Sequence, residues 1–142
     1  MDLEIYGKIK AEFNLSDIKP NELSPLILAH IGDAVYEVVI RTIELSKGNR
    51  PMQKLHKDTA KFVNAKAQAD IIDKIMDLLT EEELTQYKRG RNAKSGSVAK
   101  NASVSDYRKA TGFEALMGYL YLNNKNERML ELIKEGIKDA EE

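Results

Sequence analysis

Apolar residues recur at helical spacing along almost the whole chain. A short helix is expected over about residues 2–13. Ser24 followed by proline supplies a cap and a first helical residue for a long helix over about 25–45. Helical spacing continues over about 52–79, and Thr80 followed by three glutamates begins another helix, whose first-turn carboxylates suit the helix dipole. The pattern predicts an all-α fold.

The last third of the chain contains one predicted loop and two predicted helices. The stretch 89–97 is rich in glycine, serine and asparagine, which predicts a loop. Ser103 or Ser105 caps a helix that continues to about Leu122, where two asparagines end it. A final amphipathic helix is expected over about 127–138. With no repeat and no linker, residues 1–142 are expected to form a single domain, a helical bundle.

Composition excludes several classes of chemistry. The chain has no cysteine, so disulfides, thiolate nucleophiles and cysteine-bound zinc are excluded, and its two histidines leave little material for a histidine-rich metal site. No apolar run approaches the roughly 20 residues that span a bilayer. The first residues, MDLEIYGKIK, lack the continuous hydrophobic centre of a secretory signal. We therefore expect a soluble, cytoplasmic protein.

Carboxylates interrupt two otherwise apolar segments. Asp33 and Glu37 are the only formal charges in the segment 25–40, and their spacing of four places them on neighbouring positions of one helix. Glu114 is the only charge in the segment 113–122. An unpaired carboxylate in the core costs several kcal/mol, so each of these acids is expected to have a compensating partner.

Two interpretations of these acids remain open from spacing alone. In the first, Asp33 or Glu114 pairs with Arg41, Arg108 or a backbone group. In the second, Asp33 and Glu114 converge on a hard cation such as Mg²⁺, which prefers oxygen ligands. Three glycines near these acids favour a close approach of the two helices: Gly32, Gly112 and Gly118.

The four most distinctive segments resemble those of the ribonuclease III family. Residues 28–40, LAHIGDAVYEVVI, resemble the signature helix of its catalytic domain, and residues 113–122, FEALMGYLYL, resemble its second acidic segment. The segments FVNAKAQ at 62–68 and RGRNAK at 89–94, with the chain length, resemble the reduced branch of the family, Mini-ribonuclease III. The resemblance covers about residues 20–137.

The resemblance implies an all-helical endonuclease domain that acts as a homodimer and cleaves both strands of double-stranded RNA. In the family a divalent metal, Mg²⁺ with Mn²⁺ as a substitute, activates water, and the products carry 5′-phosphates. The reduced branch is associated with maturation of the 23S ribosomal RNA precursor, assisted by a ribosomal protein on the substrate. The separate double-stranded-RNA-binding domain of the longer enzymes has no counterpart in this sequence.

Residue by residue, the resemblance assigns the catalytic and metal-ligating roles to Asp33 and Glu114. Two further acids of the longer enzymes are replaced by Ala29 and Thr111, which leaves the number of metal ions open. Glu37 either supplies a replacement ligand or is a polar residue at the dimer interface. The missing acids also support an alternative function, a non-catalytic RNA-binding or ribosome-assembly module with the same fold.

The net charge of −1 conceals a local basic segment between Gln86 and Ser105, which contains no acid. Basic and amide side chains there suit phosphate and 2′-hydroxyl contacts along an RNA duplex, although a charge run is also compatible with a plain solvated face. The RNA-binding candidates are Lys88, Arg89, Arg91, Asn92, Lys94, Lys100, Asn101 and Arg108.

Three further polar residues are weaker candidates for RNA contacts. His56, surrounded by lysines, is either an RNA contact or an ordinary surface histidine. Asn64 and Gln68, four apart on one helix face, either read the minor groove or cap a neighbouring helix. His30, on an apolar helix, is expected in the core or at an interface.

Overall fold

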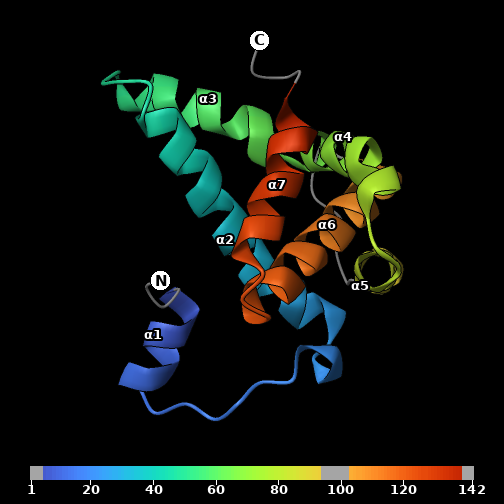
Figure 1. The fold of residues 1–142 in the computed structure, drawn as a ribbon. Helices are drawn as coiled ribbons and strands as arrows, with labels where there is room; N and C mark the ends of the chain where they lie inside the picture. Colours follow the sequence, from blue (N-terminus) through green and yellow to red (C-terminus); the bar gives the residue numbers. More distant parts are fainter. Residues whose placement is uncertain (1–4, 94–102, 139–142) are drawn as a thin grey trace.

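The computed structural model describes residues 5–93 and 103–138, and this part of the chain is helical with no strand (Figure 1). The all-α prediction is therefore confirmed. The elements in chain order are α1 (Ile5–Glu12), the 3₁₀ turn η1 (Pro20–Glu22), α2 (Pro25–Leu45), α3 (Met52–Val63), α4 (Ala65–Ile75), the 3₁₀ turn η2 (Met76–Leu78), α5 (Glu81–Asn92), α6 (Val104–Leu122) and α7 (Asn126–Ile137).

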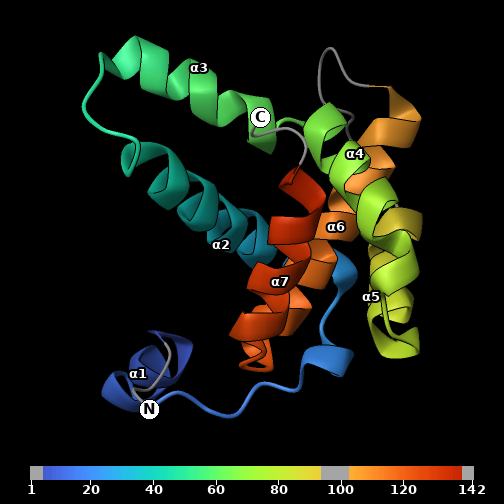
Figure 2. The ribbon, with the colours of Figure 1, turned by 45° about the horizontal axis from the view of Figure 1, so that its top comes forward.

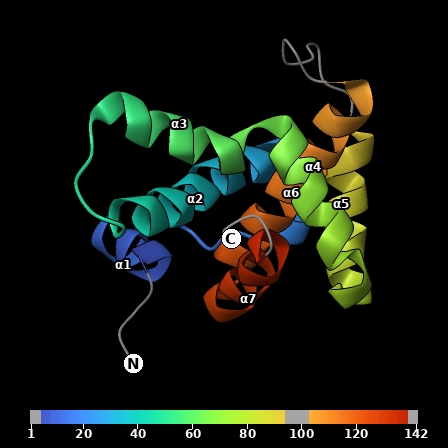
Figure 3. The same ribbon diagram turned by 90° about the horizontal axis from the view of Figure 1, so that it is seen from above.

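Helix α6 forms the centre of the bundle. It packs against α2, α4, α5 and α7, and most of its residues are buried, as expected for a helix that is apolar on nearly every face. Figures 2 and 3 show α3 running back along α2 toward α4. Helix α1 lies apart from the bundle and buries none of its own residues, although Tyr6 packs on Tyr121 of α6 with ring centroids 5.5 Å apart.

The helix starts follow local capping chemistry. The hydroxyl of Ser24 accepts the Leu26 N–H at 3.2 Å and begins α2. The hydroxyl of Ser103, and not that of Ser105, caps α6. At α5, Thr80 and the glutamate at the third helical position cap each other's backbone amides in a capping box. These starts confirm the predictions made from the sequence.

The predicted continuous helical segment 52–79 is wrong in one respect, because Asn64 divides it. The backbone of Asn64 is extended, and its side-chain oxygen accepts the Ala67 N–H at 2.8 Å, which starts α4. Its side-chain amide donates to the carbonyl of Ala60 at 3.0 Å and closes the end of α3. One asparagine therefore ends one helix and begins the next.

The loop predicted from Arg89 onward is also wrong at its start, because α5 continues as far as Asn92. Gly90 lies inside this helix in spite of its low helix propensity. A Cβ atom at Gly90 would lie 2.8 Å from the Cα of Gly112 on α6, so the residue is small to allow close packing. Residues 94–97 of the predicted loop lie outside the described residues.

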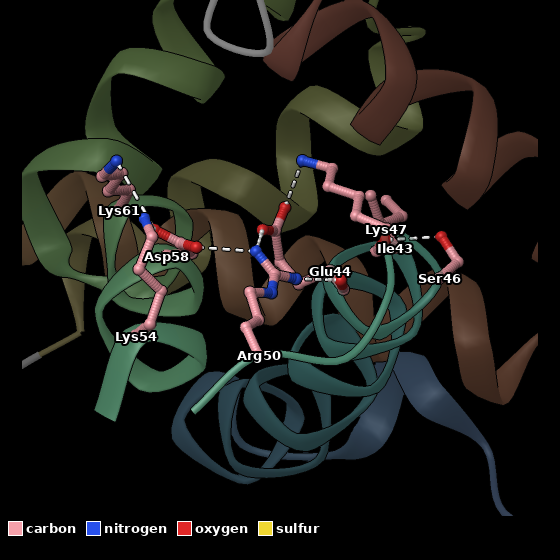
Figure 4. Close-up of polar contacts among 8 residues, drawn as sticks. All are labelled: Ile43, Glu44, Ser46, Lys47, Arg50, Lys54, Asp58 and Lys61. Atoms are coloured by element: carbon pink, nitrogen blue, oxygen red, sulfur yellow. Dashed lines mark hydrogen bonds and ion pairs between the residues drawn. The ribbon is translucent and has the colours of Figure 1, made fainter. Parts of the chain in front are cut away.

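A buried ionic cluster joins α2 to α3 and fixes the connection between them (Figure 4). The Glu44 side chain is buried, with only 2% of the residue exposed. The guanidinium of Arg50 donates to Asp58 at 2.6 Å, approaches the Glu44 carboxylate at 3.5 Å and donates to the Glu44 carbonyl oxygen. Lys47 adds an ion pair to Glu44 at 2.7 Å, and Lys54 adds one to Asp58 at 3.1 Å. Both carboxylates are therefore paired with cations where two helices and their connection meet.

Within the described ranges, no helix is long and apolar enough to cross a membrane.

Candidate active site

The candidate site lies where α2 crosses α6, and glycines bring the two backbones into contact there. A Cβ atom at Gly32 would overlap the carbonyl oxygen of Glu114 and lie 2.6 Å from the amide nitrogen of Gly118. A Cβ atom at Gly118 would in turn overlap the carbonyl oxygen of Leu28. The close approach expected from Gly32 and Gly118 is therefore confirmed, whereas Gly112 packs against Tyr87 of α5. Because Asp33 follows Gly32 directly, the crossing brings Asp33 to Glu114.

The two acids differ in exposure but act on each other. Asp33 is exposed and Glu114 is half-buried, so only Glu114 fits the expectation of a carboxylate inside the core. Burial raises the pKa of Glu114 to about 8, and a hydrogen bond and the charge of Asp33 contribute to the rise. Glu37 adds a smaller effect in the same direction. The helix crossing thus places two carboxyl groups close together, and their proximity makes ionisation of Glu114 less favourable.

One partner considered for these acids, Arg41, does not pair with them in the structure. The Arg41 guanidinium contacts Glu37 at 3.3 Å, one turn away on the same helix. The side chains that shift the pKa of Glu114 are Asp33, Gln68 and Glu37, and none of them is a cation. The acid pair is therefore suited to binding a positively charged ligand.

Gln68 is the neutral partner of Glu114. Only 1% of Gln68 is exposed. Its side-chain nitrogen donates to the carbonyl oxygen of Val63 at 3.3 Å, and a hydrogen bond from Gln68 to Glu114 works against the rise in the Glu114 pKa. The expectation that Gln68 contacts RNA does not fit this burial, because almost none of the side chain is exposed. The sequence could not indicate that Gln68 is buried, because apolar and polar residues alternate in FVNAKAQ and the pattern does not show which of them face another helix.

The acid pair fits a hard divalent cation with few protein ligands. No group of three or more histidine, cysteine, aspartate or glutamate side chains in residues 5–93 and 103–138 has the arrangement to hold a metal. Glu37 therefore does not complete a three-acid cluster. At the two positions where longer family members carry further acids, this chain has Ala29, which is buried, and Thr111, whose hydroxyl donates to the Tyr107 carbonyl at 3.0 Å. Neither side chain offers a carboxylate to a metal ion. Two carboxylates suit Mg²⁺, which keeps several of its water ligands.

The basic candidates divide into exposed side chains and anchored ones. Lys88, Asn92 and Arg108 are exposed. Arg91 is half-buried with its guanidinium 5.6 Å from the centre of the Tyr87 ring, a cation–π contact. The remaining candidates in this segment, Lys94, Lys100 and Asn101, lie outside the described residues.

Arg89 is half-buried, and its role in the structure is to anchor α5. Its guanidinium donates to the Gln86 side chain at 2.8 Å and to the Leu23 carbonyl at 2.7 Å. Gln86 in turn donates to the side chain of Asn21 at 3.1 Å. These contacts tie the middle of α5 to the segment that leads into α2, and they occupy donors that a direct RNA contact would need.

The three histidine and asparagine candidates are all exposed. His56 lies on the exposed side of α3, and Asn64 is exposed while capping α4. His30 is exposed on α2, so the expectation that it lies in the core of this chain is wrong. An interface position for His30 remains a prediction.

Fold and sequence both match known proteins. The Ribonuclease III domain family matches residues 26–125. The chain therefore belongs to the ribonuclease III family, which accounts for an all-helical bundle with two acids at a helix crossing. Within that family its relatives are Mini-ribonuclease 3 proteins. It is 52% identical over 132 residues to the one from Clostridium tetani, covering 92% of this chain and 86% of the relative, and 50% identical to the one from Brevibacillus brevis, covering 86% and 91%.

A solved structure supports the fold independently. The crystal structure of a protein from Fusobacterium nucleatum matches with a TM-score of 0.77 and 35% sequence identity, covering 87% of this chain and 99% of that one. Together, these similarities identify the chain as an endoribonuclease of the Mini-ribonuclease 3 type, acting on double-stranded RNA with a divalent metal ion.

Proposed function

We propose that residues 1–142 act as a single catalytic domain that matures the 23S ribosomal RNA precursor by hydrolysing phosphodiester bonds in its double-stranded regions. The observation that carries this proposal is the juxtaposition of Asp33 and Glu114 at the α2–α6 crossing. We assign both side chains the roles of metal ligand and catalytic residue. Because the substrate is made where ribosomes assemble, we place the activity in the cytoplasm.

The roles of the two acids follow from their different surroundings. Mg²⁺, for which Mn²⁺ substitutes, supplies charge that polarises a phosphoryl oxygen and lowers the pKa of bound water. Asp33 is exposed and presents its carboxylate to solvent, where an RNA phosphate approaches. Glu114 is half-buried and raised in pKa, so it gains most from a cation that stabilises its ionised form. With only two acids, the RNA phosphate and water complete the ligand set.

We propose that RNA is held by exposed cations and amides around α5 and the start of α6. Lys88, Asn92 and Arg108 support this proposal by their exposure, and Arg91 by its fixed position over Tyr87. Such contacts to phosphates depend on duplex shape more than on sequence. The further proposed contacts are Lys94, Lys100, Asn101, His56 and Asn64. Arg89 contributes by holding α5 in place.

The proposal includes a homodimer. Apolar residues occupy the exposed side of α2, at spacings expected for one helix face, and Val38 at 64% and Leu45 at 60% are the most exposed of them. Leu130 of α7, beside Val38 along an apolar groove between the two helices, extends this surface. Two copies related by a two-fold axis would supply one site for each RNA strand. Sedimentation measures the oligomeric state, and a cleavage assay shows whether one or both RNA strands are cut. A monomeric protein that cuts only one strand would contradict this assembly.

The substrate assignment is tested with three RNAs of equal length. One duplex has the base-paired stem sequence that flanks mature 23S RNA, one is an unrelated duplex, and one is single-stranded. We expect cleavage of both duplexes, faster cleavage of the precursor stem when its ribosomal protein is bound, and 5′-phosphate ends. Equal rates on both duplexes, with and without the ribosomal protein, would overturn the assignment to this precursor. The protein would then be an endonuclease of double-stranded RNA without preference for the precursor stem.

A further inference from the structure

We propose that Tyr36 is a positioning residue of the active site, which fixes the rotation of α2 against α6 and so holds Asp33 beside Glu114. The ring of Tyr36 contacts α6 and its hydroxyl contacts α3, so this one side chain joins α2 to both neighbouring helices. The inference rests on the proposed metal-binding and catalytic roles of the two acids. It adds a residue that acts on them through the helices that carry them.

The glycine contacts between α2 and α6 lie on one side of Asp33. A Cβ atom at Gly32 would overlap the Glu114 carbonyl oxygen, and one at Gly118 would overlap the carbonyl oxygen of Leu28. Both α2 residues precede Asp33 in the chain. Glycine has no side chain to interlock with the partner helix, so these contacts determine the distance between the helices but only weakly resist rotation of α2 about its axis. The direction in which Asp33 extends depends on that rotation.

Tyr36 supplies an interlocking contact on the other side of Asp33. It lies four residues after Gly32, and residues at this spacing are neighbours on one face of a helix. The rings of Tyr36 and Phe113 are perpendicular with centroids 5.0 Å apart, an arrangement that aromatic pairs favour, and both residues are fully buried. Phe113 directly precedes Glu114 on α6. The ring pair therefore locks the two helices together next to the residues that carry the acids.

The hydroxyl of Tyr36 holds the ring in place from α3. It donates to the carbonyl oxygen of Phe62 at 2.6 Å. Phe62 lies in the last turn of α3, where backbone carbonyls have no partner within the helix. The hydroxyl therefore satisfies a carbonyl that needs a donor, and the end of α3 in turn fixes the position of the ring. Phenylalanine would fill nearly the same space without this hydrogen bond, which accounts for tyrosine at this position.

The test replaces Tyr36 by leucine, which removes the ring contact and the hydrogen bond, and by phenylalanine, which removes only the hydrogen bond. Mn²⁺ binding to the RNA-free protein is measured by calorimetry, and kcat and KM are measured with duplex RNA. We expect Tyr36→Leu to lose about 10-fold or more in Mn²⁺ affinity and in kcat, because a displacement of about 1 Å in a reacting group is enough for such a loss. KM should stay within about two-fold. Tyr36→Phe should recover most of the loss, because the ring pair remains.

Leu132→Ala is the matched control for a merely structural role. Leu132 is fully buried on α7, which packs on α4 and α6 and carries neither acid. This substitution should also lower the free energy of unfolding, but should leave Mn²⁺ affinity and the rate per folded molecule unchanged. Unchanged Mn²⁺ affinity and kcat in Tyr36→Leu would overturn the inference. Equal losses in Tyr36→Leu and Leu132→Ala would show a general loosening of the core and would also overturn it.

A second variant keeps the inference testable if Tyr36→Leu does not fold. Phe113→Leu removes the same ring contact from the α6 side and leaves the Tyr36 hydroxyl in place, so it should lower Mn²⁺ affinity and kcat while KM is retained. Wild-type Mn²⁺ affinity in Phe113→Leu would contradict the inference. Failure of the proposed function is distinguishable, because in that case Glu114→Gln would retain metal-dependent cleavage, whatever the substitutions of Tyr36 do.

Discussion

Gly32 of α2 lies in backbone contact with Glu114 of α6, close enough that a Cβ atom would overlap the Glu114 carbonyl oxygen. This contact determines the distance between the helices at the point where their acids meet. It also explains why both helices carry glycine inside a regular helix, where the residue is otherwise unfavourable.

Gly32→Ala should separate the helices and disturb the acid pair. The added methyl group meets backbone atoms, which cannot rotate away, so we expect a loss of about 3 kcal/mol in the free energy of unfolding and a loss of cleavage by the folded fraction. Urea unfolding and cleavage rate are the measurements. Gly136→Ala is the control, because its methyl group meets the side chain of Ile71 on α4 and not the backbone at the α2–α6 crossing. Gly136→Ala should lose stability but keep its rate per folded molecule. Full activity in Gly32→Ala would contradict the role of the close crossing.

The raised pKa of Glu114 predicts a pH dependence of stability in the metal-free protein. Between pH 4.5 and about 8 the unfolded chain ionises at this position while the folded chain keeps its proton. The folded state binds more protons, so this site lowers the free energy of unfolding as pH rises, by at most about 1.4 kcal/mol per pH unit. Glu114→Gln removes the effect. Urea unfolding should show that Glu114→Gln gains stability relative to wild type from about pH 5 to about pH 8. A difference that does not change with pH would contradict the pKa shift.

Arg50→Ala should be among the most destabilising single substitutions outside the site. It removes the guanidinium that pairs with both Asp58 and the buried Glu44, at a cost of about 3–5 kcal/mol in the free energy of unfolding. Lys47→Ala removes a partner whose side chain is 45% exposed, and should cost less than about 1 kcal/mol. Thermal unfolding of the two variants gives the comparison. Equal effects would indicate that Lys47 contributes as much as Arg50 to balancing the charge of Glu44.

Arg108→Ala should weaken RNA binding through loss of one phosphate contact. Duplex affinity is expected to fall for all sequences alike, and the slope of log affinity against log salt should become shallower by about 0.9. Filter binding at several salt concentrations measures both quantities. Lys138→Ala, an exposed cation at the end of α7, is the control and should leave both unchanged. An unaltered slope for Arg108→Ala would remove Arg108 from the RNA surface.

The parts of the fold that local chemistry controls were predictable from the sequence. Ser24, Thr80 and Ser103 each carry a side chain that caps the helix beginning next to it, so the sequence alone indicates those helix starts. Asn64 and Gly90 were misjudged for the opposite reason. Asn64 interrupts a helical pattern that its neighbours continue. Gly90 lies inside α5 against Gly112 of another helix, a contact that its own segment does not indicate.

The candidate site was likewise predictable from the sequence only in part. Asp33 and Glu114 stand out in the sequence because each carries charge within an apolar segment, and the flanking glycines indicate that their helices approach closely. The position of Gln68 depends on how α4 packs on α6, which its own segment does not encode. The Glu44–Arg50–Asp58 cluster was missed because its members come from two helices and the connection between them, with no periodic spacing.

The most direct test of the account is single-turnover cleavage of a labelled RNA duplex by wild type, Asp33→Asn and Glu114→Gln, with Mg²⁺ and with chelator, and with duplex binding measured in parallel. Asp70→Asn, which changes an exposed acid on α4, serves as the control. We predict metal-dependent cleavage by wild type and the control, and a loss of about 100-fold or more in both site variants with RNA binding retained. Cleavage at the wild-type rate by either Asp33→Asn or Glu114→Gln would contradict the claim that this acid pair is the catalytic centre.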